Sequence, residues 1–343
     1  METLNYEVLK KSGYNGYIKE SAPEKVMQFG EGNFLRAFVD YFFDCANEKA
    51  DWNGKVVLVQ PIAQGLTKLI NDQEGLYTLY LRGSEKGEKV DLKRVISSVS
   101  RCINPYDDFD AVLELAKSDD LEYIVSNTTE AGIVHESESK FDQCPPISFP
   151  AKLTRVLYER YKAGKDGVVV LSCELIDNNG KELQKCVNEY IDDWGLEEEF
   201  KTWINEKNTF CSTLVDRIVP GFPKKDIESI KARLGYDDNL VVQGEAFHLW
   251  VIEAPESVAE EFPASRAGLN VLFVPSEKPY HERKVTLLNG PHTVLSPVAF
   301  LSGINIVRDA CQHAVVGKYI HRVMYDELME STGSAERRTG TFC

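Results

Sequence analysis

Positive charge is scarce in this sequence. Its 343 residues include 39 Lys and Arg against 54 Asp and Glu, which gives a formal net charge of −15. Such a surface repels a phosphate backbone and an anionic membrane alike. We therefore expect no nucleic-acid partner and no membrane partner. A small anionic substrate can still bind, because a local basic pocket can oppose the overall field.

Signals for export, for a membrane span and for a metal site are also missing from the sequence. The N-terminal stretch METLNYEVLKKSGYNGY lacks the apolar core of a signal peptide, and no apolar run approaches the roughly 20 residues of a spanning helix. The eight cysteines form no CxxC pair, and the six histidines form no paired motif. These absences predict a cytoplasmic protein with reduced thiols and no bound metal.

Short apolar runs alternate with helical patterns along the first half of the chain. Runs of this kind suit strands that are covered on both faces, as in a parallel sheet with crossover helices. The alternation predicts a doubly wound α/β fold. The predicted strands are KVMQFG (25–30), KVVLVQP (55–61), LEYIVSN (121–127) and GVVVLSCEL (167–175), and the helical stretches between them include 34–50 and 107–120.

The segment 75–103 interrupts this alternation. It contains two or three extended pieces and a Gly- and charge-rich turn around 83–88, which predicts antiparallel strands inserted after the second strand. Further strands are expected in 241–254 and 269–275, and the pattern becomes helical after about 276. The predicted domains are therefore 1–275, which holds the sheet, and 276–343, the start of a mostly helical domain.

A glycine-containing turn follows the first predicted strand in QFGEGNFLRAF (28–38). Gly30 and Gly32 lie where a Rossmann turn brings backbone amides onto a pyrophosphate, although Leu35 replaces the third glycine of that pattern. A simple structural turn is the alternative. The candidate cofactor-binding residues in this stretch are Phe29, Gly30, Gly32, Asn33 and Phe34.

Two further strand ends bear on the cofactor. The second strand ends in Gln60 and Pro61, without the acid that usually takes the ribose hydroxyls and without an arginine for a 2′-phosphate, which favours NAD weakly over NADP. SNTTEAGI (126–133) places Asn127, Thr128 and Glu130 at the carboxyl end of another strand, where open α/β sheets bind ligands. A capped helix start is the alternative there.

The stretch KVTLLNGPHT (284–293) combines a lysine, an amide and an imidazole around a sequence that disfavours a regular helix. On an α-helix, Lys284, His292 and Asn289 would lie at roughly 0°, 80° and 140° around the axis, so all three could face one cleft. They could supply a proton donor, an oxyanion partner and a hydroxyl partner for carbonyl reduction. A solvated lysine and a structural histidine are the alternative interpretation, and Asn-Gly-Pro predicts that the helix breaks after the lysine.

Three motifs in this order resemble the mannitol dehydrogenase family of polyol-specific long-chain dehydrogenases. They are GEGNF (30–34), LVDRIVP (214–220) and K-x4-N-x2-H (284–292). From spacing alone, the Asp216–Arg217 pair in the second motif is typical of a structural ion pair. The resemblance implies a Rossmann-type domain, a mostly helical second domain and metal-independent hydride transfer. It also implies that Lys284 is the acid/base and that Asn289 and His292 hold the reacting oxygen.

Within this family, SCELIDNNG (172–180) is similar to the tagaturonate reductase (altronate oxidoreductase) branch, because Glu174 and Leu175 stand where mannitol and fructuronate branches carry Asp-Asn. That likeness implies a sugar-acid substrate, D-tagaturonate or D-altronate, with Glu174 and Asp216 as candidate substrate-binding residues. Fructuronate reductase, a sugar-alcohol or sugar-alcohol phosphate dehydrogenase, and a non-catalytic NAD-binding fragment remain the alternatives.

The end of the chain departs from the family. After VGKYIHRVMYDELME (316–330), the polar stretch STGSAERRTGTFC carries no helical periodicity, and a truncated helical domain is expected. Truncation would expose apolar side chains such as Leu295, Phe300 and Ile304. Such an exposed apolar surface could be covered by a second copy of the chain in a homo-oligomer.

Overall fold

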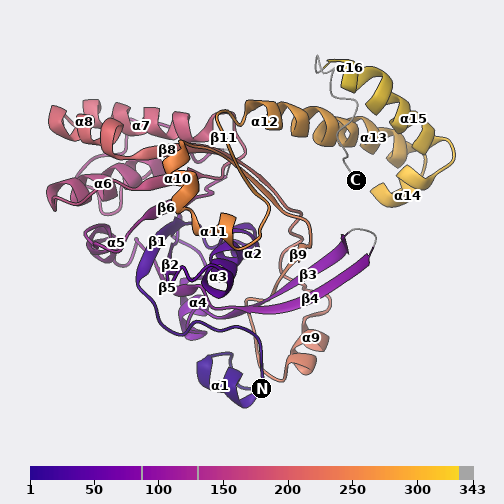
Figure 1. Cartoon of the computed structure of the whole chain (residues 1–343), viewed down its shortest axis with the longest axis horizontal. Coiled ribbons are helices and arrows are strands. Elements are labelled where there is room, and N and C mark those ends of the chain that lie inside the picture. The colour runs from indigo at the N-terminus through magenta and orange to yellow at the C-terminus, as the bar shows by residue number, and fades with distance from the viewer. Residues whose placement is uncertain (86–87, 130, 332–343) are drawn as a thin grey trace. The chain divides into compact units, whose positions relative to one another are not determined.

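A computed structural model describes residues 1–85, 88–129 and 131–331. The chain separates into two compact units, Met1–Pro275 and Ser276–Cys343, which are described one at a time (Figure 1). In the described part of the chain, every helix is too short or too polar to cross a membrane.

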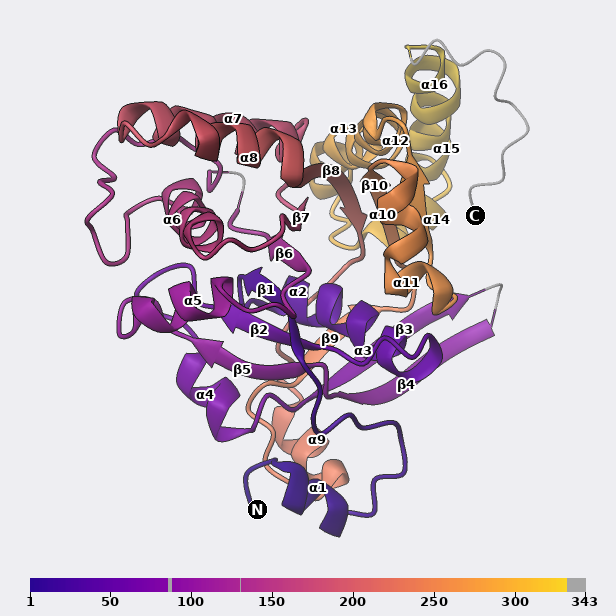
Figure 2. The same ribbon diagram turned by 60° about the vertical axis from the view of Figure 1, so that its left-hand side comes forward.

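The first unit is built on an eight-stranded sheet whose central part is parallel (Figures 1 and 2). Its order is β11-β10-β8-β7-β6-β1-β2-β5, and β10 is antiparallel to β8. The six strands from β5 to β8 have the order of a doubly wound sheet, which confirms the predicted fold class. The strands are β1 (Glu24–Phe29), β2 (Lys55–Val59), β5 (Val99–Ile103), β6 (Tyr123–Ser126), β7 (Val169–Ser172), β8 (Thr209–Asp216), β10 (Leu249–Glu253) and β11 (Val271–Val274).

Alternate residues of the central strands enter two separate cores. In β1, Val26 belongs to one hydrophobic cluster and Met27 to the other, and both side chains are fully buried. A strand that is covered on both faces must be apolar at successive positions, which is why the runs were so uniform. The covering helices are α3 (Val39–Lys49), α5 (Phe109–Ala116), α6 (Phe149–Lys162), α7 (Asn179–Asp193) and α8 (Glu198–Lys207).

A second sheet has the order β4-β3-β9. The hairpin of β3 (Tyr77–Glu85) and β4 (Glu88–Ile96) confirms the inserted antiparallel strands, but the third extended piece, β5, joins the main sheet beside β2. The stretch 241–254 is also divided, because β9 (Val242–Glu245) pairs with β3 whereas β10 pairs with β8. Sequence periodicity identifies a strand, but it does not choose the partner.

Shorter helices complete the first unit. The predicted helix over 34–50 is interrupted at Phe38, which has φ −123° and ψ −79° and packs its ring against Phe34 and Phe42. The interruption separates α2 from α3. The shorter helices are α1 (Tyr6–Lys11), α2 (Asn33–Ala37), α4 (Thr67–Asp72), α9 (Ile227–Leu234), α10 (Glu256–Glu261) and α11 (Pro263–Arg266).

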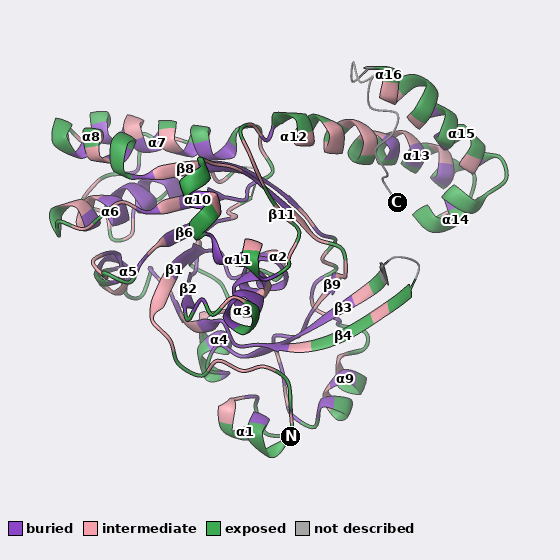
Figure 3. Ribbon diagram, in the orientation of Figure 1, coloured by how far each residue is buried: buried purple, intermediate pink, exposed green. Residues whose placement is uncertain are grey.

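In its described part, the second unit consists of helices and the short connections between them. Leu295 is only 3% exposed and lies in a small hydrophobic core within this unit, so its predicted exposure is wrong, whereas Phe300 is 72% exposed. Figure 3 shows both buried and exposed residues along the helices of this unit. Ile304 is partly buried against that core. The elements are α12 (Lys278–Lys284), η1 (Val285–Asn289), α13 (Gly290–Leu301), α14 (Val307–Gln312), α15 (Val316–Arg322), η2 (Val323–Leu328) and α16 (Met329–Ser331), where η denotes a π-helical turn.

Candidate functional site

The glycine turn lies between β1 and α2, at the carboxyl end of the parallel strands. The chain order of the sheet reverses here, since β2 lies on one side of β1 and β6 on the other. Open α/β sheets bind ligands at this switch point. The structure therefore places Gly30 and Gly32 where the fold puts a dinucleotide.

Glycine suits positions 30 and 32 for different physical reasons. Gly30 has φ +128°, and a Cβ there would lie 2.8 Å from Leu35 Cδ1 and 3.3 Å from the Asn127 carbonyl oxygen. Leu35 thus fills the space beneath the turn at the position of the missing third glycine. A Cβ on Gly32 would meet no atom within 4 Å, and the residue is exposed. The turn is therefore packed from below and open from above, which fits a phosphate group at its backbone.

The other residues proposed for this stretch differ in what they present. Phe29 is fully buried and packs on Phe149, so only its backbone reaches the edge of the sheet. Phe34 is partly buried and stacks on Phe38 with ring centroids 5.2 Å apart. Asn33 is exposed. The exposed residues of this stretch are therefore Gly32, which offers only backbone atoms, and Asn33.

The loop after β6 adjoins the glycine turn. The Asn127 N–H donates to the Phe29 carbonyl at 3.2 Å, and its side-chain amide donates to the Cys173 carbonyl at 3.1 Å. Thr129 has φ +79°, which is strained for a β-branched residue and typical of functional loops. No helix begins in the described residues 127–129 or 131–148, so the alternative of a capped helix start is wrong. Glu130 lies outside the described residues.

Glu174 connects this loop to the end of β7. Its carboxylate accepts from the Thr128 N–H at 3.0 Å, from the Thr128 hydroxyl at 3.1 Å and from the Ser126 hydroxyl at 3.1 Å. The side chain is 2% exposed, and burial raises the pKa of its carboxyl group. Glu174 thus holds the loop in place from within the protein.

Gln60 and Glu31 organise the loop after β2. The buried Gln60 amide donates to the Ile62 carbonyl at 2.8 Å and accepts from the Thr67 hydroxyl at 2.8 Å. Glu31 accepts from the Leu66 N–H, and burial raises the pKa of its carboxyl group. A Cβ on Gly65 would lie 2.3 Å from Glu31 Oε1, so a larger residue there would displace the Glu31 carboxylate. The loop after β2 is therefore tied to the glycine turn.

Arg217 donates to backbone carbonyls at the end of β8. These are the oxygens of Ala37 at 2.6 Å, Phe247 at 3.1 Å and Ala246 at 3.3 Å. Burial lowers the pKa of Arg217 to about 10. The arginine joins α2 to the chain between β9 and β10 through these carbonyls, and the structural ion pair with Asp216 stays a prediction. Asp216 pairs with Leu249 in the sheet.

Lys284, Asn289 and His292 lie in the second unit on a helix that does not break. Lys284 ends α12, the next five residues form the π-helical turn η1, and α13 follows. The Gly290 N–H donates to the Val285 carbonyl, five residues back. A proline inside an α-helix clashes with the carbonyl four residues before it, whereas Pro291 stands in the first turn of α13. The predicted break is therefore wrong, and a π turn replaces it.

The π turn changes which side chains share a face of the helix. It holds one residue more than an α turn, so the residues after it are set back by about 100°. Relative to Lys284, Asn289 then lies at roughly 40° and His292 at roughly −20°. The three residues thus come onto one side of the helix. Lys284 is partly buried, whereas Asn289 and His292 are exposed.

His292 has a defined tautomer in this arrangement. Its Nδ1 lies 2.8 Å from the Leu288 carbonyl oxygen. A carbonyl can only accept, so Nδ1 carries the hydrogen in this contact and Nε2 takes no part in it.

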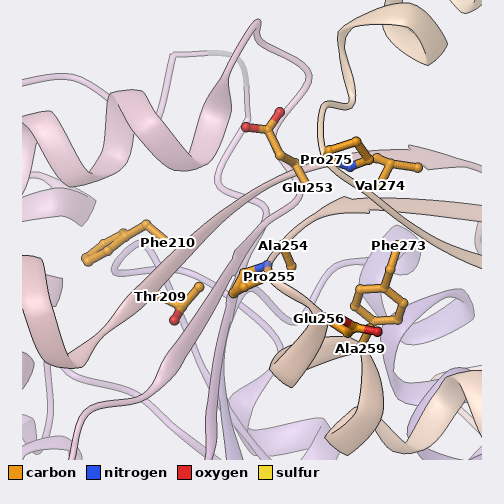
Figure 4. Close-up of a pocket in the computed structure, with 10 residues that line it drawn as sticks. All are labelled: Thr209, Phe210, Glu253, Ala254, Pro255, Glu256, Ala259, Phe273, Val274 and Pro275. Carbon is orange, nitrogen blue, oxygen red and sulfur yellow. The ribbon is translucent and has the colours of Figure 1, made fainter.

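A cavity of about 680 Å³ lies at the opposite edge of the sheet (Figure 4). Thr209 and Phe210 at the start of β8, Glu253 at the end of β10 and Phe273 of β11 line it. The glycine turn lies at the other end of the parallel strands, so this cavity is separate from the predicted cofactor site. In the described residues, no cluster of His, Cys, Asp and Glu has the arrangement of a metal site.

The doubly wound sheet and the glycine turn at its switch point define a Rossmann-type dehydrogenase fold. More particularly, the chain belongs to the mannitol dehydrogenase family. Residues 24–265 match the mannitol dehydrogenase Rossmann domain, and residues 277–336 match the mannitol dehydrogenase C-terminal domain.

Similar proteins of known name include several altronate oxidoreductases. The chain is 56% identical to that of Phocaeicola vulgatus (96% of this chain, 68% of the relative). It is 57% identical to that of Bacteroides thetaiotaomicron (91% and 66%) and 48% identical to that of Bacillus subtilis (94% and 67%). The chain thus spans about two thirds of the length of these relatives.

Solved structures share the fold. The mannitol 2-dehydrogenase of Pseudomonas fluorescens, in a ternary complex with NAD and D-mannitol, has a TM-score of 0.77 at 22% identity and covers 96% of this chain and 69% of its own. A D-sorbitol dehydrogenase has a TM-score of 0.76 at 23% identity, with 94% and 69% covered.

Proposed function

We propose that this chain is an NAD-dependent oxidoreductase that interconverts D-tagaturonate and D-altronate. The observation that carries the proposal is the 48–57% identity to altronate oxidoreductases over 91–96% of the chain. The open glycine turn and the alignment of Lys284, Asn289 and His292 on one side of a helix support it.

The cofactor would lie on the glycine turn and the loop after β6. Gly30, Gly32 and Asn33 would hold the pyrophosphate, and Asn127 and Thr128 would line the next part of the groove. When bound, NAD(H) gives or accepts the hydride. NAD is favoured over NADP for two reasons. The Gln60 amide already forms hydrogen bonds within the loop after β2, and PIAQGL (61–66) contains no Lys or Arg that could bind a 2′-phosphate.

The proton would move through Lys284. In the reducing direction its ammonium gives a proton to the alkoxide oxygen, and in the oxidising direction the neutral amine takes the proton from the hydroxyl. Asn289 would donate a hydrogen bond to the same oxygen. Nε2 of His292 would orient a neighbouring hydroxyl, because the Leu288 carbonyl fixes the other ring nitrogen.

Glu174 and Asp216 are the acids proposed on the substrate side. With 2% exposure and three donors on its carboxylate, Glu174 would act by shaping the loop at Thr128. Asp216 ends β8 at the carboxyl edge of the sheet, where a substrate hydroxyl could reach it.

A substrate panel tests the proposal. Purified protein is mixed with NADH and with D-tagaturonate, D-fructuronate, D-fructose or a ketose phosphate, and NADH absorbance is followed. We expect the highest kcat/KM with D-tagaturonate and a lower rate with NADPH. A higher kcat/KM with another ketose would refute the substrate assignment. Binding of NADH without reduction of any of them would refute catalysis by this chain.

A further inference from the structure

Arg36 lies buried directly beneath the glycine turn. Its side chain is 2% exposed, although it carries a full charge. Nε donates to the Glu31 carbonyl at 3.1 Å, Nη2 to the Asn33 side-chain oxygen at 2.9 Å and Nη1 to the Leu240 carbonyl at 2.5 Å. Two of these three acceptors belong to the turn itself, so Arg36 folds back onto the residues that precede it.

Gln28 holds the neighbouring carbonyl in the same way. Its side chain is fully buried at the end of β1, and its amide donates to the Gly30 carbonyl at 3.0 Å. Two successive carbonyls of the turn, Gly30 and Glu31, therefore point inward to buried side-chain donors.

Inward carbonyls fix the direction of the next amides. In a trans peptide the C=O and the following N–H point in opposite directions, so the N–H groups of Glu31 and Gly32 face away from these two donors. The Glu31 N–H meets the carboxylate of its own side chain. The Gly32 N–H therefore points away from Arg36, and the space around Gly32 is open, because a Cβ there would meet no atom within 4 Å.

Arg36 also sets the orientation of Asn33. Because Nη2 holds the Asn33 oxygen, the Asn33 nitrogen is directed elsewhere, and a Cβ on Gly221 would lie 2.8 Å from it. The positive guanidinium beneath the turn further favours an anion above it.

We propose that Arg36 is a positioning residue for the dinucleotide. It holds the Glu31 carbonyl and the Asn33 side-chain oxygen from beneath, so that the Gly32 N–H is directed at the pyrophosphate before it binds. The identity of this turn as the cofactor turn rests on the proposed function, but binding of NADH can be measured without any sugar substrate.

Arg160 provides a matched control within the same unit. It is also buried, at 3% exposure, and it donates to four backbone carbonyls: Asp166 at 2.6 Å, Ser118 at 2.8 Å, Ala116 at 2.9 Å and Leu121 at 3.1 Å. These carbonyls precede β6 and β7, at the edge of the sheet opposite the glycine turn. Substitution of Arg160 thus measures the effect of replacing a buried arginine whose hydrogen bonds lie outside the glycine turn.

The experiment compares Arg36→Lys, Arg36→Ala and Gln28→Met with Arg160→Lys and Arg160→Ala in the full chain. The NADH dissociation constant comes from a fluorescence titration, stability from the unfolding midpoint, and kcat and KM for NADH from steady-state rates. One ammonium cannot reach three acceptors, so we expect Arg36→Lys to weaken NADH binding by about tenfold or more. We expect kcat at saturating NADH to change much less, and Gln28→Met to act in the same direction.

The Arg160 variants should lose stability and keep the NADH affinity of the parent chain. The proposal is overturned if Arg36→Lys binds NADH as the parent does, or if Arg160→Lys at equal stability loses as much affinity. It is also overturned if the parent chain binds no NADH. Should Arg36→Ala fail to fold, Arg36→Lys and Gln28→Met decide the matter. A parent chain that binds NADH but reduces no hexuronate contradicts the proposed function and leaves this inference testable.

Discussion

Lys284 is the residue on which the proposed proton transfer depends. Replacing it with Ala removes the acid and base, so turnover of D-tagaturonate should fall by about 10²–10⁴-fold while NADH affinity stays unchanged. Steady-state rates and a fluorescence titration measure the two quantities. Lys278→Ala is the control, because Lys278 begins the same helix with its side chain 75% exposed and should be dispensable. Near-parental turnover in Lys284→Ala would remove the lysine from the mechanism.

Asp40 makes stability depend on pH. It is fully buried on α3 and accepts from the Tyr77 hydroxyl at 3.0 Å. Burial raises the pKa of its carboxyl group to about 7, against the opposing effects of Tyr77 and Arg36. In the unfolded chain an aspartate has a pKa near 3.9. At pH values between these two, the Asp40 carboxyl group keeps its proton in the native state and releases it in the unfolded state. Its contribution to the free energy of unfolding is therefore fully present below about pH 4 and is lost as pH rises to about 7.

Asp40→Asn should remove this pH dependence. The amide keeps an acceptor for Tyr77 but does not titrate. From pH 5 to pH 8 the parent chain should lose about 2–3 kcal/mol more unfolding free energy than the variant does. Urea unfolding at both pH values measures the difference, and the other buried acids cancel because both proteins contain them. A difference that is independent of pH would contradict the prediction.

At the scale of an element, η1 is the feature that brings the predicted catalytic residues together. Inserting one alanine between Lys284 and Val285 adds a residue to the helix and should rotate Asn289 and His292 away from Lys284 by about 100°. We expect helix content by circular dichroism and NADH binding to be retained, whereas turnover is lost. The control is Thr286→Ala, which keeps the residue count and should keep activity. An active insertion variant would show that the alignment is unnecessary.

The sequence predicts elements better than their partners. Apolar runs such as KVVLV gave the right strands because burial on both faces demands them. The strands that pair with β5 and β9 could not be predicted in the same way, since these partners lie far away in the chain. The role of Gln28 was likewise missed, although a polar residue at the end of an apolar strand is the signal that could have revealed it.

At the scale of the whole molecule, the division into two units has a testable consequence. The unit Met1–Pro275 contains both cores of the main sheet and the whole glycine turn. A chain ending at Pro275 should therefore fold and bind NADH, but it should not reduce D-tagaturonate, because it lacks Lys284. Cooperative unfolding, a fluorescence titration and an absorbance assay check the three parts. A fragment that cannot fold would show that the second unit contributes to the stability of the first.

Sequence alone determined the fold class, the glycine turn and the candidate trio at 284, 289 and 292, because periodicity, turn chemistry and spacing are local properties of the chain. The tertiary structure decided what those properties could not. Distant backbone pairing assigned β5 and β9 to different sheets. A hydrogen bond over five residues turned an expected helix break into η1 and altered the geometry of the trio. Packing buried Arg36 and Gln28 under the turn, because a charge or an amide inside a protein is stable only where the fold supplies its partners.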